Sequence, residues 1–363
     1  MSSSTLRVLI VKLSSLGDVV HAMPAVQDMR GALPGVRIDW VVERGFAPLV
    51  WRCEGVERVI PCDLRRWRKS LLDSQTRREW RDFKSALQAD AYDAVIDLQG
   101  LTKSALVSWL ARTGPEGKRY GLAHQTEGSS FEAPARWVAD KSISMDPHVH
   151  AVQRSRVLCA QALGYKLPET LRYGMKPQAL AMPWPTATAP SRTQSVNAFL
   201  PKKPVVALVH GTSRADKQWA EQSWVALGQR LNHQGFAVAL AHGNAAEKKT
   251  SEAIAAQLDE AWVWPAMALD ALTDTLAHCS GVIGVDSGLS HMAVALNLPH
   301  VQIYNFDTAW RTGPVVFTDQ PTESAVSPNS TGQRQLSVFG NPQPSVDLVW
   351  GAWESLATPV LCQ

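Results

Sequence analysis

Short apolar runs of β-forming residues alternate with longer helical stretches along this chain, and the alternation occurs twice. Runs such as 8–11 (Val-Leu-Ile-Val) and 94–96 (Ala-Val-Ile) are apolar without interruption. Such runs are typical of strands in a parallel sheet that helices cover on both faces. The alternation therefore predicts an α/β fold with doubly wound parallel sheets. The predicted strands are Leu6–Lys12, Val36–Val42, Arg58–Pro61, Tyr92–Asp97, Pro204–His210, Phe236–Ala241, Gly281–Asp286 and Val301–Tyr304.

A segment rich in proline, serine and threonine separates the two series of strands. The chain of 363 residues is long enough for two hydrophobic cores, because single cores stop growing at about 250–300 residues. We predict a Rossmann-like domain at 1–176, a linker at 177–203 and a second Rossmann-like domain at 204–363, whose last helix, 345–355, could pack back on the first domain. Two such domains would face a ligand cleft at the C-terminal ends of their strands.

Composition excludes several classes of protein. The chain is 45% hydrophobic and 19% charged, which is typical of a globular protein and not of a disordered or fibrous one. Its five cysteines are scattered and form no C-x-x-C pair, so neither a disulfide framework nor a zinc site is expected. Lys12 interrupts the first apolar run, which is too short for an export signal, and no run approaches the ~20 apolar residues of a membrane-spanning helix. A cytoplasmic protein is expected.

Positive charge is concentrated in one stretch of the chain. Between Arg65 and Lys84 there are eight basic and three acidic residues, whereas the net charge of the whole chain is only +3. A solvated helix face is the usual explanation of such a run. The alternative is a docking surface for a phosphorylated partner or an anionic membrane. No nucleic-acid partner is expected.

The loop after the first predicted strand reads Ser-Ser-Leu-Gly-Asp at 14–18. It has one glycine, and neither G-x-G-x-x-G nor G-x-x-x-x-G-K-S/T occurs in the chain, which disfavours dinucleotide dehydrogenases and P-loop NTPases. Asp18 could cap the following helix, because a carboxylate in the first turn interacts favourably with the helix dipole. It could equally act as a general base at the mouth of a cleft.

Two later loops also run from a predicted strand into a helix. The loop 210–219 combines a glycine, hydroxyl residues and Lys217, which would suit a phosphate cradle. In the loop 285–291, the hydroxyls and amides around Ser287 could hold a pyrophosphate, and Asp286 could hold a sugar hydroxyl. An ordinary helix cap, with His291 as a structural hydrogen-bonding residue, explains the same pattern.

Taken together, these motifs resemble those of the lipopolysaccharide heptosyltransferases. Residues 12–24 (Lys-Leu-Ser-Ser-Leu-Gly-Asp-Val-Val-His-Ala-Met-Pro) look like the opening of those enzymes, and 285–291 (Val-Asp-Ser-Gly-Leu-Ser-His) resembles their donor-binding turn. The basic block 65–69 points to the branch that adds the first heptose rather than the second. The resemblance continues, in order, through 39–43, 59–61, 65–69, 92–101, 150–154 and 216–219.

The resemblance implies a GT-B fold and an inverting transfer of heptose from ADP-heptose to the Kdo region of lipid A, in lipopolysaccharide inner-core biosynthesis. Asp18 would be the base that takes the acceptor proton, and Lys217 would neutralise charge on the departing diphosphate. The acceptor-binding residues implied by the match are Arg65, Arg66, Lys69 and Arg154. The donor-binding residues implied by the match are Thr212, Ser213, Lys217, Glu247, Met267, Asp286, Ser287, Gly288 and His291.

The same resemblance implies a peripheral protein on the cytoplasmic leaflet of the inner membrane that requires no cofactor. No metal-ligand cluster is visible, and the sequence leaves open whether a divalent cation stimulates the reaction. Three alternatives are a transferase for the second heptose, a non-catalytic nucleotide-sugar-binding protein and a nicotinamide-dependent oxidoreductase. The presence of both Asp18 and Lys217 argues against a non-catalytic binding protein. The missing glycine fingerprint argues against an oxidoreductase.

Two segments depart from the family pattern. After the predicted strand 301–304 the family has a Gly-Pro-Thr-like turn, whereas this chain reads Asn-Phe-Asp-Thr-Ala-Trp at 305–310. Around 125–135 the family's basic acceptor residue has no evident counterpart. No role is assigned to either segment from the sequence.

Overall fold

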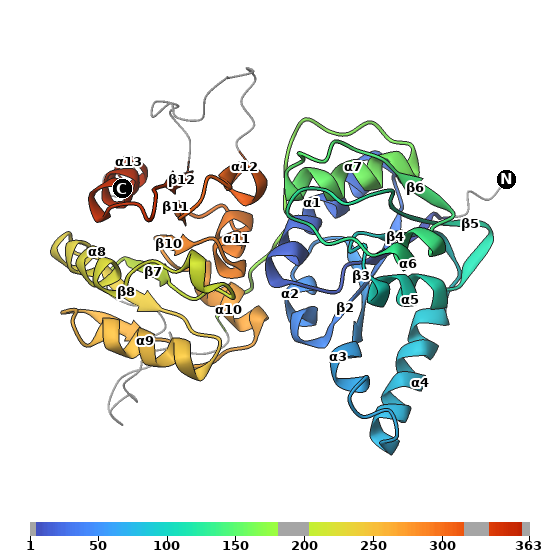
Figure 1. Ribbon diagram of the computed structural model, residues 1–363, viewed down its shortest axis with the longest axis horizontal. Coiled ribbons are helices and arrows are strands. Elements are labelled where there is room, and N and C mark those ends of the chain that lie inside the picture. The colour runs from blue at the N-terminus through green and yellow to red at the C-terminus, as the bar shows by residue number, and fades with distance from the viewer. Residues whose placement is uncertain (1–4, 181–202, 316–333, 358–363) are drawn as a thin grey trace. The chain divides into compact units, whose positions relative to one another are not determined.

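The computed structural model of the protein describes residues 5–180, 203–315 and 334–357. The chain forms two compact units, Met1–Lys176 and Pro177–Gln363 (Figure 1). Each unit has its own six-stranded sheet and its own hydrophobic core. Most of the predicted linker, residues 181–202, lies outside the described residues.

The sheet of the first unit consists of six strands, β1 (Arg7–Val11), β2 (Arg37–Glu43), β3 (Val56–Cys62), β4 (Tyr92–Asp97), β5 (Thr113–Leu122) and β6 (Lys141–Ile143). All neighbours are parallel, in the order β3-β2-β1-β4-β5-β6. This is the strand order of Rossmann-like folds, in which the direction of strand addition reverses between β1 and β4. The reversal point is where such sheets bind ligands at their carboxyl ends.

The helices of the first unit are α1 (Leu16–Ala32), α2 (Ala47–Val50), α3 (Leu64–Trp67), α4 (Ser74–Gln88), α5 (Thr102–Leu110), α6 (Ala133–Val138) and α7 (Ala151–Leu163). Helix α1 packs against α7, while α4 and α5 pack against β3 and β4 and against each other. Asp73 caps α4 by accepting a hydrogen bond from the N–H of Thr76 (2.8 Å). The α4 side chains Phe83 and Leu87 join the core, whereas α3 and the N-terminal end of α4 extend beyond the sheet (Figure 1).

The second unit repeats the same topology. Its strands are β7 (Val205–Val209), β8 (Ala237–Leu240), β9 (Ala261–Val263), β10 (Gly281–Val285), β11 (His300–Tyr304) and β12 (Gln335–Phe339). Their parallel order, β12-β11-β10-β7-β8-β9, places the reversal point between β7 and β10. Its helices are α8 (Glu221–His233), α9 (Ala245–Ala255), α10 (Leu269–Leu276), α11 (Gly288–Ala295), α12 (Ala309–Thr312) and α13 (Val346–Ala357).

Helix α13, the last of the chain's described helices, contributes to the core of the second unit. It packs against β11, β12 and α8, and its Val349 and Trp353 are buried among the core residues. The ring of Trp353 meets the ring of Phe236 edge to face, with 5.8 Å between centroids. The helix therefore completes its own unit, and a packing on the first unit stays a prediction.

The predicted doubly wound α/β class is confirmed by two all-parallel sheets with helices between the strands. All eight predicted strands are present, but four of the observed strands, β5, β6, β9 and β12, were not predicted. These four lie at or next to sheet edges and are only partly buried. Polar residues interrupt β5, β6 and β12, and β9 has only three residues, so none shows the longer apolar run that marks a central strand. Within the described ranges, no helix is long and apolar enough to span a membrane.

Candidate active site

Asp18 lies at the reversal point of the first sheet. Strand β1 ends at Val11, a four-residue loop follows, and α1 begins at Leu16. The Asp18 carboxylate accepts hydrogen bonds from the backbone N–H (3.1 Å) and the hydroxyl (2.8 Å) of Ser15, the N-cap of α1. Asp18 therefore caps α1 and also lies at the edge of the sheet where such folds bind ligands.

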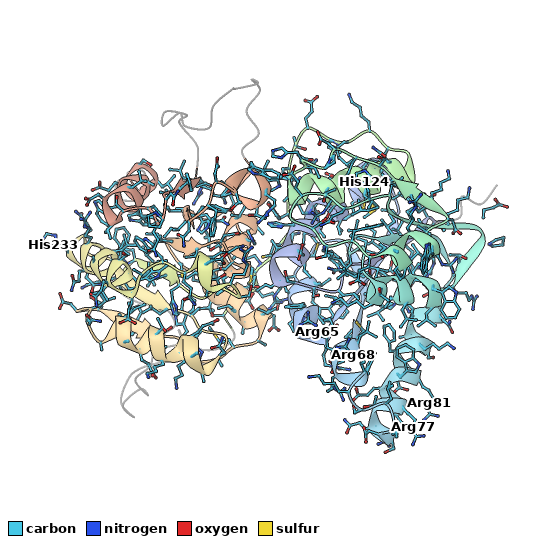
Figure 2. The ribbon with its side chains drawn as sticks, viewed as in Figure 1. Arg65, Arg68, Arg77, Arg81, His124 and His233 are labelled. Atoms are coloured by element: carbon cyan, nitrogen blue, oxygen red, sulfur yellow. The ribbon has the colours of Figure 1, made fainter. Side chains whose placement is uncertain are left out.

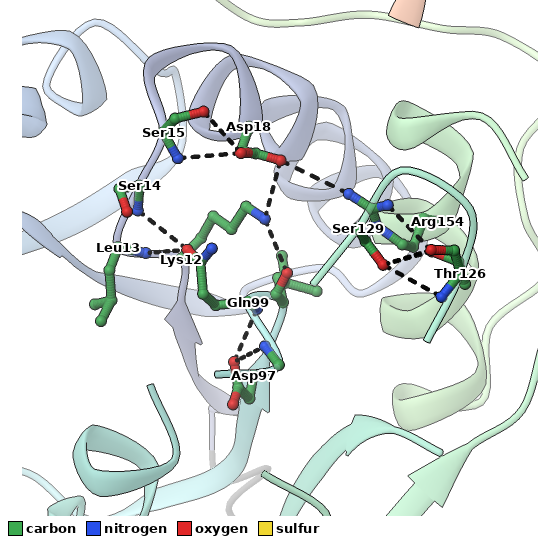
Figure 3. A network of polar contacts seen from close by, with 12 residues as sticks. Lys12, Leu13, Ser14, Ser15, Asp18, Asp97, Gln99, Thr126, Ser129 and Arg154 are labelled. Atoms are coloured by element: carbon green, nitrogen blue, oxygen red, sulfur yellow. Dashed lines mark hydrogen bonds and ion pairs between the residues drawn. The ribbon is translucent and has the colours of Figure 1, made fainter. Parts of the chain in front are cut away.

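Two buried cations contact Oδ1 of the same carboxylate, the oxygen that Ser15 does not bind (Figure 3). The Nζ of Lys12 lies 3.4 Å from Asp18 Oδ1 and also donates to the backbone oxygen of Leu98 at 3.0 Å. A guanidinium nitrogen of Arg154 lies 3.7 Å from Asp18 Oδ1. The side chains of Lys12 and Arg154 are 3% and 7% exposed, whereas that of Asp18 is 34% exposed. The carboxylate is thus held by cations from the protein side and remains open to solvent.

These contacts set the protonation state of Asp18. Burial raises the pKa of the Asp18 carboxyl, but the charge of Lys12, the hydrogen bonds from Ser15 and the charge of Arg154 outweigh burial and lower the pKa to about 2. Burial also lowers the pKa of Lys12, and Asp18 partly opposes that shift. Asp18 is therefore ionised at neutral pH, as a group that accepts a proton must be.

Gln99, which follows the neighbouring strand β4, holds the loop between β1 and α1 in place. The carboxylate of Asp97, at the end of β4, accepts hydrogen bonds from the backbone N–H groups of Gln99 (2.8 Å) and Gly100 (3.0 Å). The side-chain oxygen of Gln99 in turn accepts the N–H groups of Leu13 and Ser14, both at 3.1 Å. The loops that follow β1 and β4 are thereby tied together at the reversal point (Figure 3).

The segment 125–135, to which no role was assigned, positions Arg154. The hydroxyl of Thr126 accepts a hydrogen bond from Arg154 (3.2 Å) and lies 2.9 Å from the hydroxyl of Ser129. Helix α7 begins at Ala151, so Arg154 lies in its first turn. The structure therefore places Arg154 beside the carboxylate of Asp18, and its predicted contact with an acceptor stays a prediction.

The predicted acceptor residues of the basic block lie on α3 and just after it. Arg65 and Lys69 are exposed, and neither forms an ion pair with any residue that the structure describes. Arg66 is also exposed, but its guanidinium pairs with Asp63 at 2.6 Å and with Glu79. Arg65 and Lys69 thus carry available charge, whereas the charge of Arg66 is already balanced by two carboxylates.

Lys217 and Asp286 meet at the reversal point of the second sheet. Lys217 lies in the loop after β7, and Asp286 directly follows β10. The Nζ of Lys217 is 2.5 Å from one carboxylate oxygen of Asp286, and Nε2 of His291 is 3.3 Å from the other. Burial raises the pKa of Asp286, but His291 and Lys217 outweigh burial and hold this pKa well below its usual range. A fixed cation therefore lies at the edge where the sequence predicts a phosphate cradle.

Hydroxyl groups surround this ion pair. Thr212 donates to the backbone oxygen of Asp286 at 3.5 Å, and Thr312 donates to its carboxylate at 3.2 Å. Ser287 is the N-cap of α11, which begins at Gly288, and its hydroxyl is buried without a hydrogen-bond partner among the described residues. An N-cap hydroxyl and the first amides of a helix are suited to an anionic ligand. Ser213, by contrast, is exposed.

Glu247 lies against the loop that follows β7. A Cβ atom on Gly211 would come within 2.9 Å of the Glu247 carboxyl carbon, so the carboxylate lies close to the backbone of Gly211. Glu247 also accepts the N–H of Gly243 at 2.6 Å. The sulfur of Met267, which precedes α10, accepts a weak hydrogen bond from Thr275 at 3.8 Å. The ribose and adenine contacts implied for Glu247 and Met267 stay predictions.

Asn305 is the first residue after β11, where the sequence departs from the family pattern. It anchors the turn that carries Lys217. The side-chain amide of Asn305 donates to the backbone oxygens of Asp216 (3.0 Å) and Gln218 (2.9 Å), the residues on either side of Lys217. Asn305 itself is only 8% exposed. The amide therefore restrains the backbone on both sides of the lysine.

The residues of the two sites that were not identified from the sequence include Lys12, Gln99 and Asn305. Lys12 interrupts an apolar strand at its carboxyl end, and a charge at that position was an available signal. Gln99 and Asn305 act through hydrogen bonds to distant backbone groups, which leave no local pattern. In the described parts of the chain, no group of three or more His, Cys, Asp or Glu side chains is arranged to bind a metal ion.

Known proteins are similar to this chain in sequence and in fold. The model of glycosyltransferase family 9 (heptosyltransferase) matches residues 80–339. Lipopolysaccharide heptosyltransferase 1 of Pseudomonas aeruginosa is 39% identical over 301 residues, covering 82% of this chain and 78% of that protein. The enzyme of the same name from Escherichia coli K12 is 38% identical over 300 residues, covering 82% and 88%. The structure of E. coli heptosyltransferase WaaC with ADP matches with a TM-score of 0.77 and 31% identity, over 97% of this chain and all of that one. With its two Rossmann-like units of the GT-B type, this chain belongs to glycosyltransferase family 9, the heptosyltransferases.

Proposed function

We propose that this protein transfers L-glycero-D-manno-heptose from ADP-heptose to the Kdo region of lipid A, with inversion at the anomeric carbon. The two relatives are named lipopolysaccharide heptosyltransferase 1, and the matched E. coli structure contains ADP. The observation that carries the proposal is the chemistry at the reversal points of the two sheets. One holds an ionised, accessible carboxylate, and the other holds a fixed lysine beside a helix N-terminus.

The first site would supply the base. In the proposed step the acceptor hydroxyl bonds to the anomeric carbon while the bond from that carbon to the phosphate oxygen breaks. The hydroxyl proton passes to Asp18, and ADP leaves with the bonding electron pair. Because the pKa of Asp18 is about 2, the proton moves only when the new bond has made the acceptor oxygen strongly acidic. Lys12 and Arg154 keep the carboxylate ionised until that point.

The second site would stabilise the leaving group. Negative charge grows on the diphosphate as the glycosidic bond breaks, and Lys217 is held in place by Asp286 before the substrate arrives. A cation already oriented in this way needs no reorganisation during the reaction. Thr212, Ser287 and Gly288 would contribute hydroxyl and amide donors to the same phosphates.

No cofactor is required in this mechanism, because Lys217 supplies the positive charge that a metal ion would otherwise provide. Turnover should therefore persist in the presence of a chelator such as EDTA, and a divalent cation would at most stimulate it. Complete loss of turnover in EDTA, restored by Mg²⁺, would show that the leaving group depends on a metal.

The basic block would bind the acceptor at the cytoplasmic leaflet of the inner membrane. Arg65 and Lys69 have no carboxylate partner among the described residues and would meet acceptor phosphates or Kdo carboxylates. Arg66 would join them by exchanging Asp63 and Glu79 for the ligand. Basic residues near an anionic surface also contribute about 1 kcal/mol each to membrane association.

The test is mass spectrometry of the lipid after incubation with protein and ADP-heptose. Lipid A bearing Kdo should gain one heptose, and the Asp18→Asn variant should give almost no product. A parallel reaction uses an acceptor that already carries the first heptose. It distinguishes the proposed activity from transfer of the second heptose. Gain of mass only on that second acceptor would replace the proposal, and binding of ADP-heptose without any transfer would indicate a non-catalytic protein.

A further inference from the structure

The first unit contains a cavity of about 1450 Å³. Arg65 of the basic block lies in its wall, but the other lining residues have no role in the mechanism above. It is lined by α3, α4, α5 and the segments beside them. Leu71 and Leu106, at 66% and 41% exposed, are apolar side chains left in contact with water at this cavity. The apolar part of the wall consists of Leu64, Trp67, Leu71, Trp80, Leu101 and Leu106.

Cationic side chains line the rest of the cavity. Figure 2 shows Arg65 and Arg68 beside α3, and Arg77 and Arg81 on α4. In the described parts of the chain, none of these four arginines forms an ion pair. The carboxylate among the lining residues, Glu132, is occupied by hydrogen bonds from the N–H (2.7 Å) and the hydroxyl of Thr102. The cavity therefore combines an apolar wall with a strong excess of available positive charge.

Lys103 connects the wall of the cavity to the loop that precedes α1. Lys103 lines the cavity, and its Nζ donates to the hydroxyl of Ser14 at 2.8 Å. Burial lowers the pKa of Lys103, the nearby charge of Arg65 lowers it further, and the charge of Glu43 partly opposes both effects. Lys103 thus adds a cation to the cavity wall and contacts the loop that precedes α1.

We propose that this cavity binds an acyl chain of the lipid on which the acceptor sugar is built, with a phosphate of that lipid at the surrounding arginines. The inference rests on the proposed function, since it extends the acceptor site from the sugar to its lipid anchor. Charge complementarity identifies the occupant: an apolar wall removes a hydrocarbon chain from water, and unpaired guanidinium groups bind phosphate. A sugar or nucleotide alone would leave the apolar wall exposed.

A kinetic test compares acylated Kdo-bearing lipid A with the same acceptor after complete deacylation. The double variant Leu71→Ser/Leu106→Ser should raise KM for the acylated acceptor about tenfold or more. Its kcat and KM for the deacylated acceptor, and its KM for ADP-heptose, should stay near those of the unchanged protein. Leu72→Ser is the matched control, because Leu72 is 89% exposed, adjacent in sequence and not part of the cavity wall.

Two kinetic results would overturn the proposal. If Leu72→Ser impairs the acylated acceptor as much as the double variant does, the leucines act by general insertion into lipid rather than through the cavity. If the double variant impairs both acceptors equally, the cavity does not recognise an acyl chain. Thermal unfolding and the conservative variant Leu106→Met, which should keep normal kinetics, show that the fold is intact.

A binding measurement separates this proposal from the proposed function. Calorimetric titration with dodecyl phosphate, below its micelle concentration, should show binding to the unchanged protein and to Leu72→Ser. The double variant should bind it about tenfold more weakly, and inorganic phosphate should bind weakly to all three. Dodecyl phosphate binding no tighter than inorganic phosphate would overturn the cavity site even if heptose transfer is observed. Tight, variant-sensitive binding without heptose transfer would instead leave the cavity as a lipid site and overturn the proposed function.

Discussion

The first site depends on a single carboxylate held between buried cations. Lys12 and Arg154 are almost completely inaccessible to solvent, so their charges act on Asp18 with little screening. The carboxylate is ionised and oriented, but its pKa of about 2 makes it a weak proton acceptor in the resting protein. The residue is therefore suited to a reaction in which the acceptor proton becomes acidic before it is transferred.

Asp18→Asn tests the base directly. The substitution removes the proton-accepting group with almost no change of volume, so we expect kcat to fall by about 10²–10⁴-fold. Binding of ADP, measured by calorimetry, should be nearly unchanged, because the proposed donor-binding residues lie in the other unit. A variant that keeps more than about a tenth of the original rate would exclude Asp18 as the general base.

Lys12→Met tests the electrostatic setting of Asp18 through the pH profile. Removing a positive charge raises the pKa of the carboxyl, so the acid limb of kcat/KM should move to higher pH. The unchanged enzyme should show no acid limb from Asp18 between about pH 4 and 8, since its pKa is about 2. Arg154→Leu should shift the limb in the same direction but less far, because Lys12 has the larger effect on Asp18. An acid limb that is identical in all three proteins would mean that another group titrates.

Lys217→Ala tests the leaving-group site. Charge on the diphosphate is greater in the transition state than in bound ADP-heptose, so the expected loss lies mainly in kcat, by about 10²-fold or more. Asn305→Ala is an informative companion, because it removes the anchor of the Lys217 turn without removing the cation. It should cause a smaller loss of the same kind. A change confined to KM for the donor would reduce Lys217 to a binding residue.

At the scale of elements, α7 serves both the site and the core with two neighbouring arginines. Arg154 contacts the carboxylate of Asp18, whereas Arg156 is buried and ties α7 to α1. The guanidinium of Arg156 contacts both carboxylate oxygens of Asp28 at 2.6 and 3.1 Å. It also donates to the backbone oxygens of Pro168 (2.8 Å) and Thr170 (2.9 Å), which fixes the segment after the helix.

Arg156→Met should therefore destabilise the first unit. It leaves the Asp28 carboxylate buried without a counter-charge, which costs about 3–5 kcal/mol of unfolding free energy. Urea denaturation measures the change, and the double variant Arg156→Met/Asp28→Leu should regain part of the lost stability because no charge is then left buried. A loss below about 1 kcal/mol in the single variant would mean that solvent reaches Asp28 after the substitution.

At the scale of the whole molecule, the basic block is the main departure from an even distribution of charge. The chain carries +3 overall, yet five more basic than acidic residues lie between Arg65 and Lys84. A concentration of positive charge attracts anionic molecules from a distance. Salt weakens that attraction, because the Debye length at physiological ionic strength is only about 8 Å.

Replacing Arg65, Arg66 and Lys69 with alanine should raise KM for the acceptor and leave KM for the donor unchanged. The salt dependence of activity should also decrease, because the screened attraction has been removed. Among single variants, Arg65→Ala should have a larger effect than Arg66→Ala, whose guanidinium is already paired with two carboxylates. Acceptor kinetics that are unchanged at both low and high salt would assign the block to an ordinary solvated surface.

The sequence by itself determined the parallel α/β class, the central strands and the strand-to-helix junctions at which Asp18, Lys217 and Asp286 lie. These features have local signatures, because a buried parallel strand is continuously apolar and its carboxyl end leads into a helix. The sequence could not show β5, β6, β9 and β12, which are only partly buried. Polar residues interrupt β5, β6 and β12, and β9 is apolar but only three residues long.

Only the tertiary structure decided which side chains meet. Sheet pairing brings Lys217 to Asp286, 69 residues away, and brings Asn305 to the backbone of Asp216, 89 residues away. It likewise places Gln99 against the loop of Ser14, and Lys103 between that loop and the cavity. Such contacts depend on strand order and register, which a linear pattern of residue types does not encode, and they determine the charge and position of the reactive groups.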